Sequence, residues 1–204
     1  MTDAAMMGAA GDLVPPDIAA SYEVHEWRNA VTVLQHAYPK EWADVLAVLR
    51  GFRLSKSFIQ VGGGNKSKVS AAIDAALYAR GWEERKFDAA VVVDEQTYPS
   101  PTHSVDCYKN KIALEIEWNN KDPFFDRDLN NFRLLFELRV VSVGIIVTRC
   151  DELQEIFHSL GRGSSYGMST THMSKLLPKI EGGGAGGCPV ILFGIRASLY
   201  DPTS

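Results

Sequence analysis

The sequence predicts an α/β protein with a mixed, partly antiparallel central sheet flanked by helices. Three observations lead to this prediction. Segments with apolar residues at helical spacing precede, separate and follow short runs of β-branched residues. The chain has 204 residues, which favours a single domain, and 46% of them are hydrophobic, which supplies a substantial core. No stretch approaches the ~18 consecutive apolar residues of a membrane-spanning helix, so we expect no membrane contact.

The charge and the cysteines restrict the partners and the compartment. A formal net charge of −4 disfavours indiscriminate coating of nucleic acid but is compatible with a basic cleft. Cys107, Cys150 and Cys188 are odd in number and widely spaced, which argues against a disulfide framework and favours the reducing cytoplasm. Residues 1–17 lack the features of a secretory signal, and we expect a disordered leader there, followed by a single domain over residues 18–200.

The first part of the domain is expected to be helical. Apolar residues recur at intervals of three and four over residues 18–50, and Pro39 divides them, which predicts two helices. The segment Gly62-Gly63-Gly64-Asn65 then interrupts the helical pattern. Ser67 is placed to cap a helix that ends at Arg80-Gly81 and passes into Trp82-Glu83-Glu84.

Strands are expected in the middle of the chain. Residues 89–93 form a short β-branched run, and a proline-containing connection is expected over residues 97–102. Residues 105–108 are expected to meet residues 112–118 across a turn at Lys109-Asn110, which gives a small antiparallel meander.

The second half of the chain alternates helices with buried strands. Dense apolar residues at helical spacing predict a helix with a wide buried face over residues 124–140. The other expected elements are a buried strand at 141–147, an amphipathic helix at 151–160, a Gly- and Ser-rich loop at 161–171, a short helix around 173–177, a flexible glycine run at 182–187 and a buried strand at 189–195.

Three carboxylates on the predicted hairpin are the strongest chemical feature. Asp106 is followed nine residues later by Glu115, and Glu117 lies two residues further on. On a strand, Glu115 and Glu117 share one face, and Asp106 lies on the partner strand, so the three can converge. Converging anions require a cation, and oxygen ligands favour Mg²⁺, which stabilises charge on a scissile phosphate. This pattern indicates phosphodiester hydrolysis; the alternative is that the glutamates mark the solvated face of an edge strand.

With this signature the sequence resembles the BglII, BstYI and BamHI group of type II restriction endonucleases, in the PD-(D/E)XK nuclease superfamily. The order and spacing agree over about residues 18–195. The matching features are Gly81-Trp82-Glu83-Glu84, the D-x8-E-x-E signature, Trp118-Asn119-Asn120-Lys121-Asp122-Pro123-Phe124 and the long apolar helix that follows. The resemblance implies a restriction-endonuclease-like fold in a bacterial cytoplasmic enzyme, and it is closest to enzymes whose sites have a GATC core.

The resemblance also implies a role for each active-site position. Asp106 and Glu115 match the metal-binding pair, and the Ile116 carbonyl is a candidate further ligand for Mg²⁺, for which Mn²⁺ could substitute. Glu117 occupies the third position, where the superfamily usually has Lys and this group has Gln or Glu, so its role as base or metal ligand stays open. Glu84 matches a fourth position that is acidic or Asn, and the alternative is an ordinary exposed carboxylate.

Candidate DNA contacts lie in two segments and beside the first glycine run. The resemblance places recognition loops at about residues 119–123 and 161–172, and Asn amides suit adenine in the major groove. The alternatives are a plain turn, a surface loop and lysines that are only solvated. The candidate DNA-binding residues are Asn119, Asn120, Lys121, Arg162, Ser164, Ser165, Lys56, Lys66 and Lys68.

These observations together lead to a functional hypothesis. His103, His158 and His172 lack a second His or Cys at ligand spacing, and we expect them to be surface or supporting residues and not metal ligands. We predict a homodimeric, Mg²⁺-dependent type II restriction endonuclease that cuts both strands of double-stranded DNA at a short palindrome and leaves 5′-phosphate ends. The alternatives are a repair or junction-resolving nuclease of the same fold and a non-catalytic DNA-binding protein.

Overall fold

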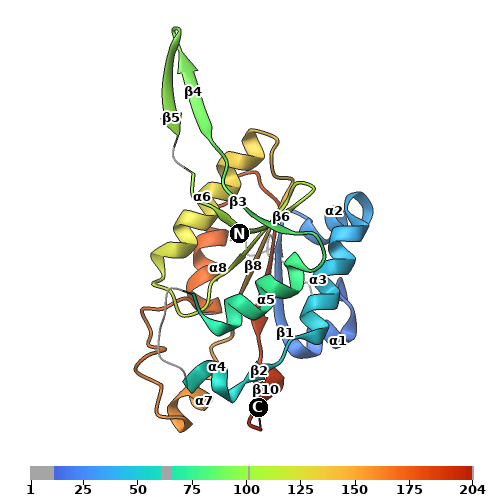
Figure 1. Ribbon diagram of the computed structural model, residues 1–204, viewed down its shortest axis with the longest axis vertical. Helices are drawn as coiled ribbons and strands as arrows, with labels where there is room; N and C mark the ends of the chain where they lie inside the picture. The colour runs from blue at the N-terminus through green and yellow to red at the C-terminus, as the bar shows by residue number, and fades with distance from the viewer. Residues whose placement is uncertain (1–11, 61–65, 101, 204) are drawn as a thin grey trace, which may run out of the picture.

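The computed structural model describes residues 12–60, 66–100 and 102–203, and within them a six-stranded mixed sheet forms the centre of the molecule (Figure 1). Its strand order is β1-β9-β8-β7-β6-β3, with β7, β8 and β9 parallel and the other neighbours antiparallel. The bounds are β1 Tyr22–Trp27, β3 Glu83–Arg85, β6 Val105–Lys109, β7 Ile112–Ile116, β8 Val143–Arg149 and β9 Val190–Ile195. The predicted α/β class, with a mixed and partly antiparallel sheet flanked by helices, is confirmed.

Helices cover both faces of this sheet (Figure 1). On one face α2, α3 and α5 share a hydrophobic cluster with strand residues such as Phe193 and Leu114. On the other face α6 and α8 share a second cluster with Ile146 and Leu192. The helices are α1 Pro16–Ser21, α2 Ala30–Ala37, α3 Pro39–Gly51, α4 Lys56–Gln60, α5 Lys68–Tyr78, α6 Pro123–Glu137, α7 Leu153–Ser159, α8 Met173–Glu181 and the 3₁₀ helix η2 Ala197–Leu199. None of the helices in the described chain has the length and apolar character that spanning a bilayer requires.

The prediction of two helices over residues 18–50 is wrong in its first part. Residues 22–27 form β1, which pairs antiparallel with β9 at the edge of the sheet. Tyr22 and Val24 are buried while Glu23 and His25 are only half-buried, which is the period of two of a strand. Pro39 begins α3, so the two helices that it separates are α2 and α3.

The packed chain begins earlier than residue 18. Residues 1–11 of the expected leader lie outside the described residues. Val14 is buried in the core, and α1 begins at Pro16. Asp17 forms an ion pair with Arg50 of α3, so residues 12–17 are part of the domain.

The middle of the chain also differs from the prediction. The expected connection at 97–102 is wrong over residues 97–100, which belong to strand β5 Gln96–Ser100; this strand pairs with β4 Ala89–Val93. The β4–β5 hairpin projects from the body of the molecule (Figure 1), so β4 is not part of the meander. The helix predicted to end at Arg80-Gly81 is α5, and residues 83–85 after it form β3 next to β6.

The predicted cap of the helix after the first glycine run is confirmed. The Ser67 hydroxyl accepts a hydrogen bond of 2.9 Å from the backbone N–H of Ser70 and caps α5. The segment Gly62-Gly63-Gly64-Asn65 lies outside the described residues. The run at 182–187, expected to be a flexible connection, forms hydrogen-bonded turns after α8, and a Cβ on Gly184 would lie 3.1 Å from Leu129 of α6. A short parallel pair, β2 Leu54–Ser55 with β10 Tyr200–Asp201, joins the C-terminal end to the domain.

The β6–β7 hairpin carries the predicted carboxylates. Cys107 pairs with Leu114, and the antiparallel pairing is as predicted. The turn residues Asn110 and Lys111 both have positive φ, +44° and +68°, which is the geometry of the tight turn that matches strand twist. After β7 the chain passes directly into residues 117–122 and α6, so the hairpin and α6 form one side of the site.

Candidate active site

Asp106 and Glu115 lie together where β6 and β7 begin to separate. The Glu115 Oε2 atom accepts a hydrogen bond of 3.3 Å from the backbone N–H of Asp106. The Asp106 Oδ2 atom in turn accepts one of 3.1 Å from the backbone N–H of Ile116. Each carboxylate is therefore held by the backbone of the opposite strand, and the register of the hairpin positions both.

Glu117 lies on the same side as Glu115, next to α6. Its Oε2 accepts a hydrogen bond of 2.7 Å from Asn120 Nδ2, and its Oε1 lies 3.3 Å from Arg127 Nη2. Glu115 and Glu117 are buried, with exposed fractions of 1% and 2%, and β7 is an interior strand between β6 and β8. The alternative in which the two glutamates mark the solvated face of an edge strand is therefore wrong.

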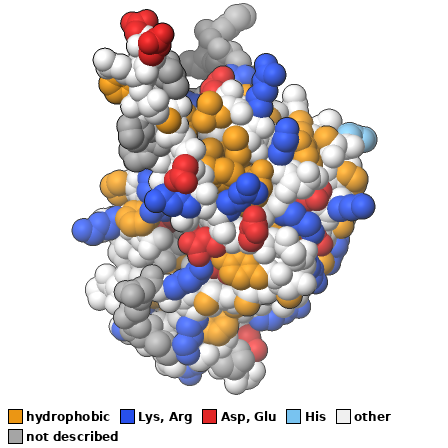
Figure 2. Space-filling view, turned by 45° about the horizontal axis from the view of Figure 1, so that its top comes forward, with side chains coloured by type: hydrophobic (Ala, Val, Ile, Leu, Met, Phe, Trp, Pro, Cys, Tyr) orange, Lys and Arg blue, Asp and Glu red, His pale blue; other side chains and the backbone are white. Residues whose placement is uncertain are grey.

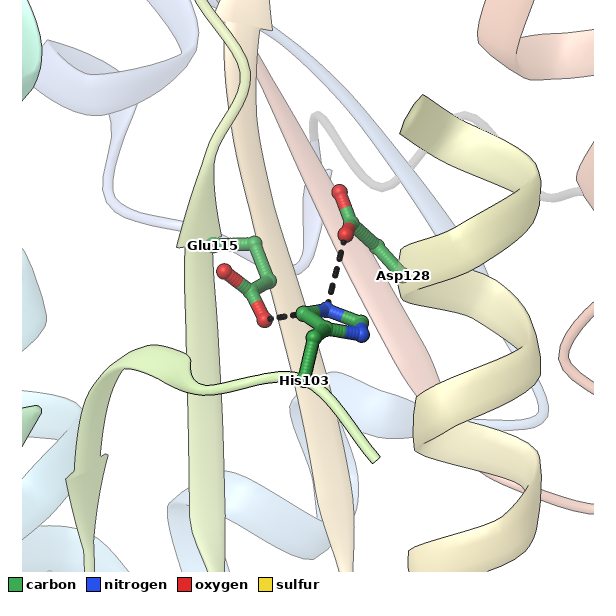
Figure 3. A group of neighbouring side chains, drawn as sticks. All are labelled: His103, Glu115 and Asp128. Atoms are coloured by element: carbon green, nitrogen blue, oxygen red, sulfur yellow. Dashed lines mark ion pairs between the residues drawn. The ribbon is translucent and has the colours of Figure 1, made fainter. Parts of the chain in front are cut away.

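Helix α6 and the segment before β6 add residues that the sequence did not single out. Asp128 of α6 is fully buried, and its Oδ1 accepts hydrogen bonds of 3.0 and 2.9 Å from Arg127 Nε and Nη2. His103 Nε2 lies 3.1 Å from Asp128 Oδ1 and 3.4 Å from Glu115 Oε1 (Figure 3). One sequence signal could have found Asp128, because it sits among Phe125, Leu129 and Phe132 on the apolar face of the helix.

A hollow opens beside these carboxylates. Two basic side chains border it, and Lys66 also forms an ion pair with the buried carboxylate of Asp74. The lining residues are Lys66, Ser67, Ser70, Asp106, Ile116, Glu117, Trp118, Asn120, Phe124 and Arg127. Glu115 lies behind Asp106 and does not border the hollow. Glu84 is exposed on β3 and does not line the hollow, although its charge acts on Lys66 at the border.

Burial of the carboxylates changes their acidity. Loss of solvation raises the pKa of Asp106, and it raises the pKa of Glu115 well above its ordinary value, with further contributions from Asp128 and Asp106. Loss of solvation and the neighbouring Asp128 raise the pKa of Glu117 to about 10. The cluster therefore contains more carboxylates than Arg127 and Lys66 can neutralise. These carboxylates are stabilised by binding either protons or a cation.

One protein-family model matches most of the chain, including the sheet and the carboxylates described above. The family model described as restriction endonuclease BglII/BglIII matches residues 22–195, from β1 to β9. The chain belongs to this restriction endonuclease family. The match covers the sheet, the carboxylates and both predicted recognition segments, and it supports the restriction-endonuclease-like fold. Membership identifies the chain as a deoxyribonuclease that binds duplex DNA. A search of individual curated proteins gives no match.

In this BglII-family endonuclease the two predicted recognition segments lie side by side. Lys121 and Thr170 form an antiparallel bridge. The backbone N–H of Thr171 donates to the Asn120 carbonyl at 2.8 Å, and that of Asp122 donates to the Ser169 carbonyl at 3.2 Å. Residues about 50 positions apart in the sequence thus form one continuous surface next to Glu117.

A buried arginine supports the second segment. Arg149, at the end of β8, is 2% exposed, and its Nη2 donates to the Tyr166 carbonyl at 3.1 Å and to the Thr170 hydroxyl at 3.0 Å. Its guanidinium lies over the ring of Phe157, 5.3 Å from the centroid. Loss of solvation lowers the pKa of Arg149 to about 10. No local pattern signals this role, because Arg149 sits at the end of an apolar strand and its partners are distant in the sequence.

The other predicted DNA-binding residues are more dispersed. Ser164 and Ser165 are exposed and Arg162 is half-buried, all within the second segment. Lys56 begins α4 and Lys68 begins α5, and neither residue lines the hollow. Figure 2 shows one face of the enzyme, on which Lys and Arg side chains are interspersed with Asp and Glu side chains and do not form a continuous basic band. Charge alone therefore does not define the DNA path on this face.

Proposed function

We propose that this family member is a Mg²⁺-dependent type II restriction endonuclease that hydrolyses both strands of duplex DNA at a short palindromic site and leaves 5′-phosphate ends. One observation carries the proposal. Asp106, Glu115, Glu117 and Asp128 gather at the β6–β7 pair, three of them buried, beside a hollow bordered by Lys66 and Arg127. Buried anions at this density are costly without a cation, and a hollow with basic borders suits a phosphate group.

The oxygen atoms offered by Asp106, Glu115 and Ile116 suit Mg²⁺ as ligands. Asp106, Glu115 and the Ile116 carbonyl would hold the ion, and all three offer oxygen, which Mg²⁺ and Mn²⁺ accept. The bound ion supplies a water of lowered pKa and stabilises charge on the scissile phosphate. In support, Asp106 and Ile116 line the hollow, and the Glu115 carboxylate contacts the Asp106 backbone directly behind it.

The chain's own side chains then have separate roles. Glu117 lines the hollow and Glu84 does not, so we assign to Glu117 the acceptance of the proton from the attacking water, with a cation bound nearby to favour its ionised form over the protonated form that burial favours without metal. Lys66 and Arg127 neutralise charge on the phosphate from the border of the hollow. Arg127 also donates to Glu117 and Asp128, and this fixes the direction in which both carboxylates point.

Recognition is assigned to the joined segments at 119–123 and 161–172. The Asn120 amide nitrogen is bonded to Glu117, whereas Asn119 Oδ1 is buried without a hydrogen-bond partner among the described residues. We assign the adenine contact to Asn119, whose buried amide oxygen would have to rotate outward to reach a base edge, in keeping with a GATC core. A twofold-symmetric homodimer would present this surface to both half-sites of a palindrome, with one strand cut in each active site.

A plasmid assay tests the proposal. Plasmid DNA of known sequence is incubated with MgCl₂ and wild-type protein, Glu115→Ala or the control Glu155→Ala, which alters an exposed residue of α7. We expect discrete fragments with 5′-phosphate ends at one sequence from the wild type and the control, and none from Glu115→Ala. Cleavage without a fixed sequence would instead indicate a repair or junction nuclease. An inactive wild type in Mg²⁺ and Mn²⁺, on methylated and unmethylated DNA, would refute the proposal.

A further inference from the structure

We propose that His103, Glu115 and Asp128 form a second cation site, on the α6 side of Glu115, that takes a divalent transition metal such as Zn²⁺, Mn²⁺ or Co²⁺. One ligand atom from each residue lies within 4.8 Å of the other two. The three side chains come from the segment before β6, from β7 and from α6, and they point toward one another (Figure 3). The site is independent of the proposed cleavage reaction, because its occupancy requires neither DNA nor turnover.

The unsatisfied atoms of this group point to a missing ligand. Glu115 is 1% exposed and Asp128 is fully buried. Glu115 Oε1, Asp128 Oδ2 and His103 Nε2 have no hydrogen-bond partner among the described residues, although the histidine lies within ion-pair distance of both carboxylates. Buried polar atoms are rarely left without partners, and a bound ion can supply the contact that such atoms lack. A cation beside His103 Nε2 and Glu115 Oε1 would supply the contact that both atoms lack.

The two oxygens of Glu115 separate this site from the one proposed for Mg²⁺. Oε2 faces the backbone of Asp106, whereas Oε1 faces His103. The Asp128 oxygen nearest to His103 is Oδ1, 3.1 Å from Nε2, and this atom also accepts hydrogen bonds from Arg127. Glu115 can therefore serve both sites, while His103 and Asp128 belong to the second alone.

The donor types select the metal. Mg²⁺ prefers oxygen ligands only, whereas an imidazole nitrogen with two carboxylates suits Zn²⁺, Mn²⁺ and Co²⁺. Three protein ligands leave a coordination position for water, and the His103 side chain is 22% exposed, so the ion has a route from solvent. A bound ion would also join the segment between the β4–β5 hairpin and β6 to helix α6. Binding should therefore stabilise the fold as well as neutralise the two carboxylates.

Titration of the DNA-free protein with Co²⁺ tests the inference. Visible absorption reports nitrogen and oxygen ligation, and calorimetry gives the affinity and stoichiometry. The variants are His103→Gln and Asp106→Asn, with His25→Gln as a matched control, because His25 is also ion-paired to a glutamate, Glu23, but is not in the three-residue group. Loss of even an outer-shell partner weakens metal binding by about 10–100-fold, so loss of His103 should weaken it at least as much.

With excess Mg²⁺ present to occupy the site at Asp106, we expect one Co²⁺ equivalent, a higher melting temperature with Co²⁺, and loss of both effects in His103→Gln but not in Asp106→Asn or His25→Gln. Excess Mg²⁺ should not displace the Co²⁺ from this site. Equal Co²⁺ binding by wild type and His103→Gln would overturn the inference, as would loss of binding in Asp106→Asn alone. Circular dichroism of His103→Gln, whose altered side chain is partly exposed, shows whether the variant is folded. An enzyme inactive on DNA that still shows the His103-dependent Co²⁺ site would refute the proposed function and leave this inference standing.

Discussion

The acidity of Glu117 makes a quantitative prediction for Glu117→Gln. In the folded chain without metal the pKa of Glu117 is raised from 4.5 to about 10, by burial and by Asp128. Between these values the folded state holds one proton that the unfolded state has lost. This contribution to stability is complete below pH 4.5 and is lost as the pH rises through the folded value. Glu117 therefore lowers the free energy of unfolding by about 1.4 kcal/mol for each pH unit in this range.

Urea unfolding in EDTA at pH 6, 7 and 8 measures this slope. Between pH 6 and pH 8, Glu117 should lower the free energy of unfolding of the wild type by about 2.7 kcal/mol. Glu117→Gln has no titrating group at this position and should not show this decrease. Glu155→Gln, an exposed carboxylate on α7, should behave as the wild type. Identical slopes in wild type and Glu117→Gln would refute the reasoning, because they would show that Glu117 is already ionised at pH 6 in the folded protein.

Three further predictions follow from other contacts. Arg149→Met removes the two hydrogen bonds that hold the second recognition segment, so gel-shift titration should show at least about tenfold weaker binding to the specific duplex, and an unchanged affinity would contradict this role. Gly144→Ala would place a Cβ 2.4 Å from Phe132, so urea unfolding should show a loss of about 1–3 kcal/mol, whereas Gly51→Ala, with nothing within 4 Å, should show no such clash. Lys66→Ala should reduce the salt dependence of DNA affinity by about one released counterion in fluorescence titrations; the same slope as the wild type would exclude a phosphate contact.

The hairpin shows what local sequence can predict about the site. Asp106 and Glu115 are nine residues apart, and a tight turn between two strands places them opposite each other whatever the rest of the chain does. The fold class followed from equally local patterns. The Ser67 cap and the apolar face of α6 are further cases in which a few neighbouring residues determine the structure.

The missed features depend on contacts between distant residues. Residues 22–27 form a strand because they pair with β9, with Tyr22 opposite Ile195, and their apolar residues also satisfy a helical spacing. His103 and Asp128 reach Glu115 only when α6 packs on the sheet and the segment before β6 turns inward. Residues 83–85 form an exposed strand because the chain after α5 joins the edge of the sheet next to β6.

The bridge between Lys121 and Thr170 has a consequence for engineering new sequence specificity. Residues 120–122 and 169–171 share backbone hydrogen bonds, so a side chain introduced in one segment is aligned by the other. Libraries that randomise one segment alone would sample new side chains on a backbone whose shape is still determined by the unaltered partner. Exchanges between homologous enzymes should therefore transplant both segments together with Arg149, and variation should be selected as pairs of substitutions across the bridge.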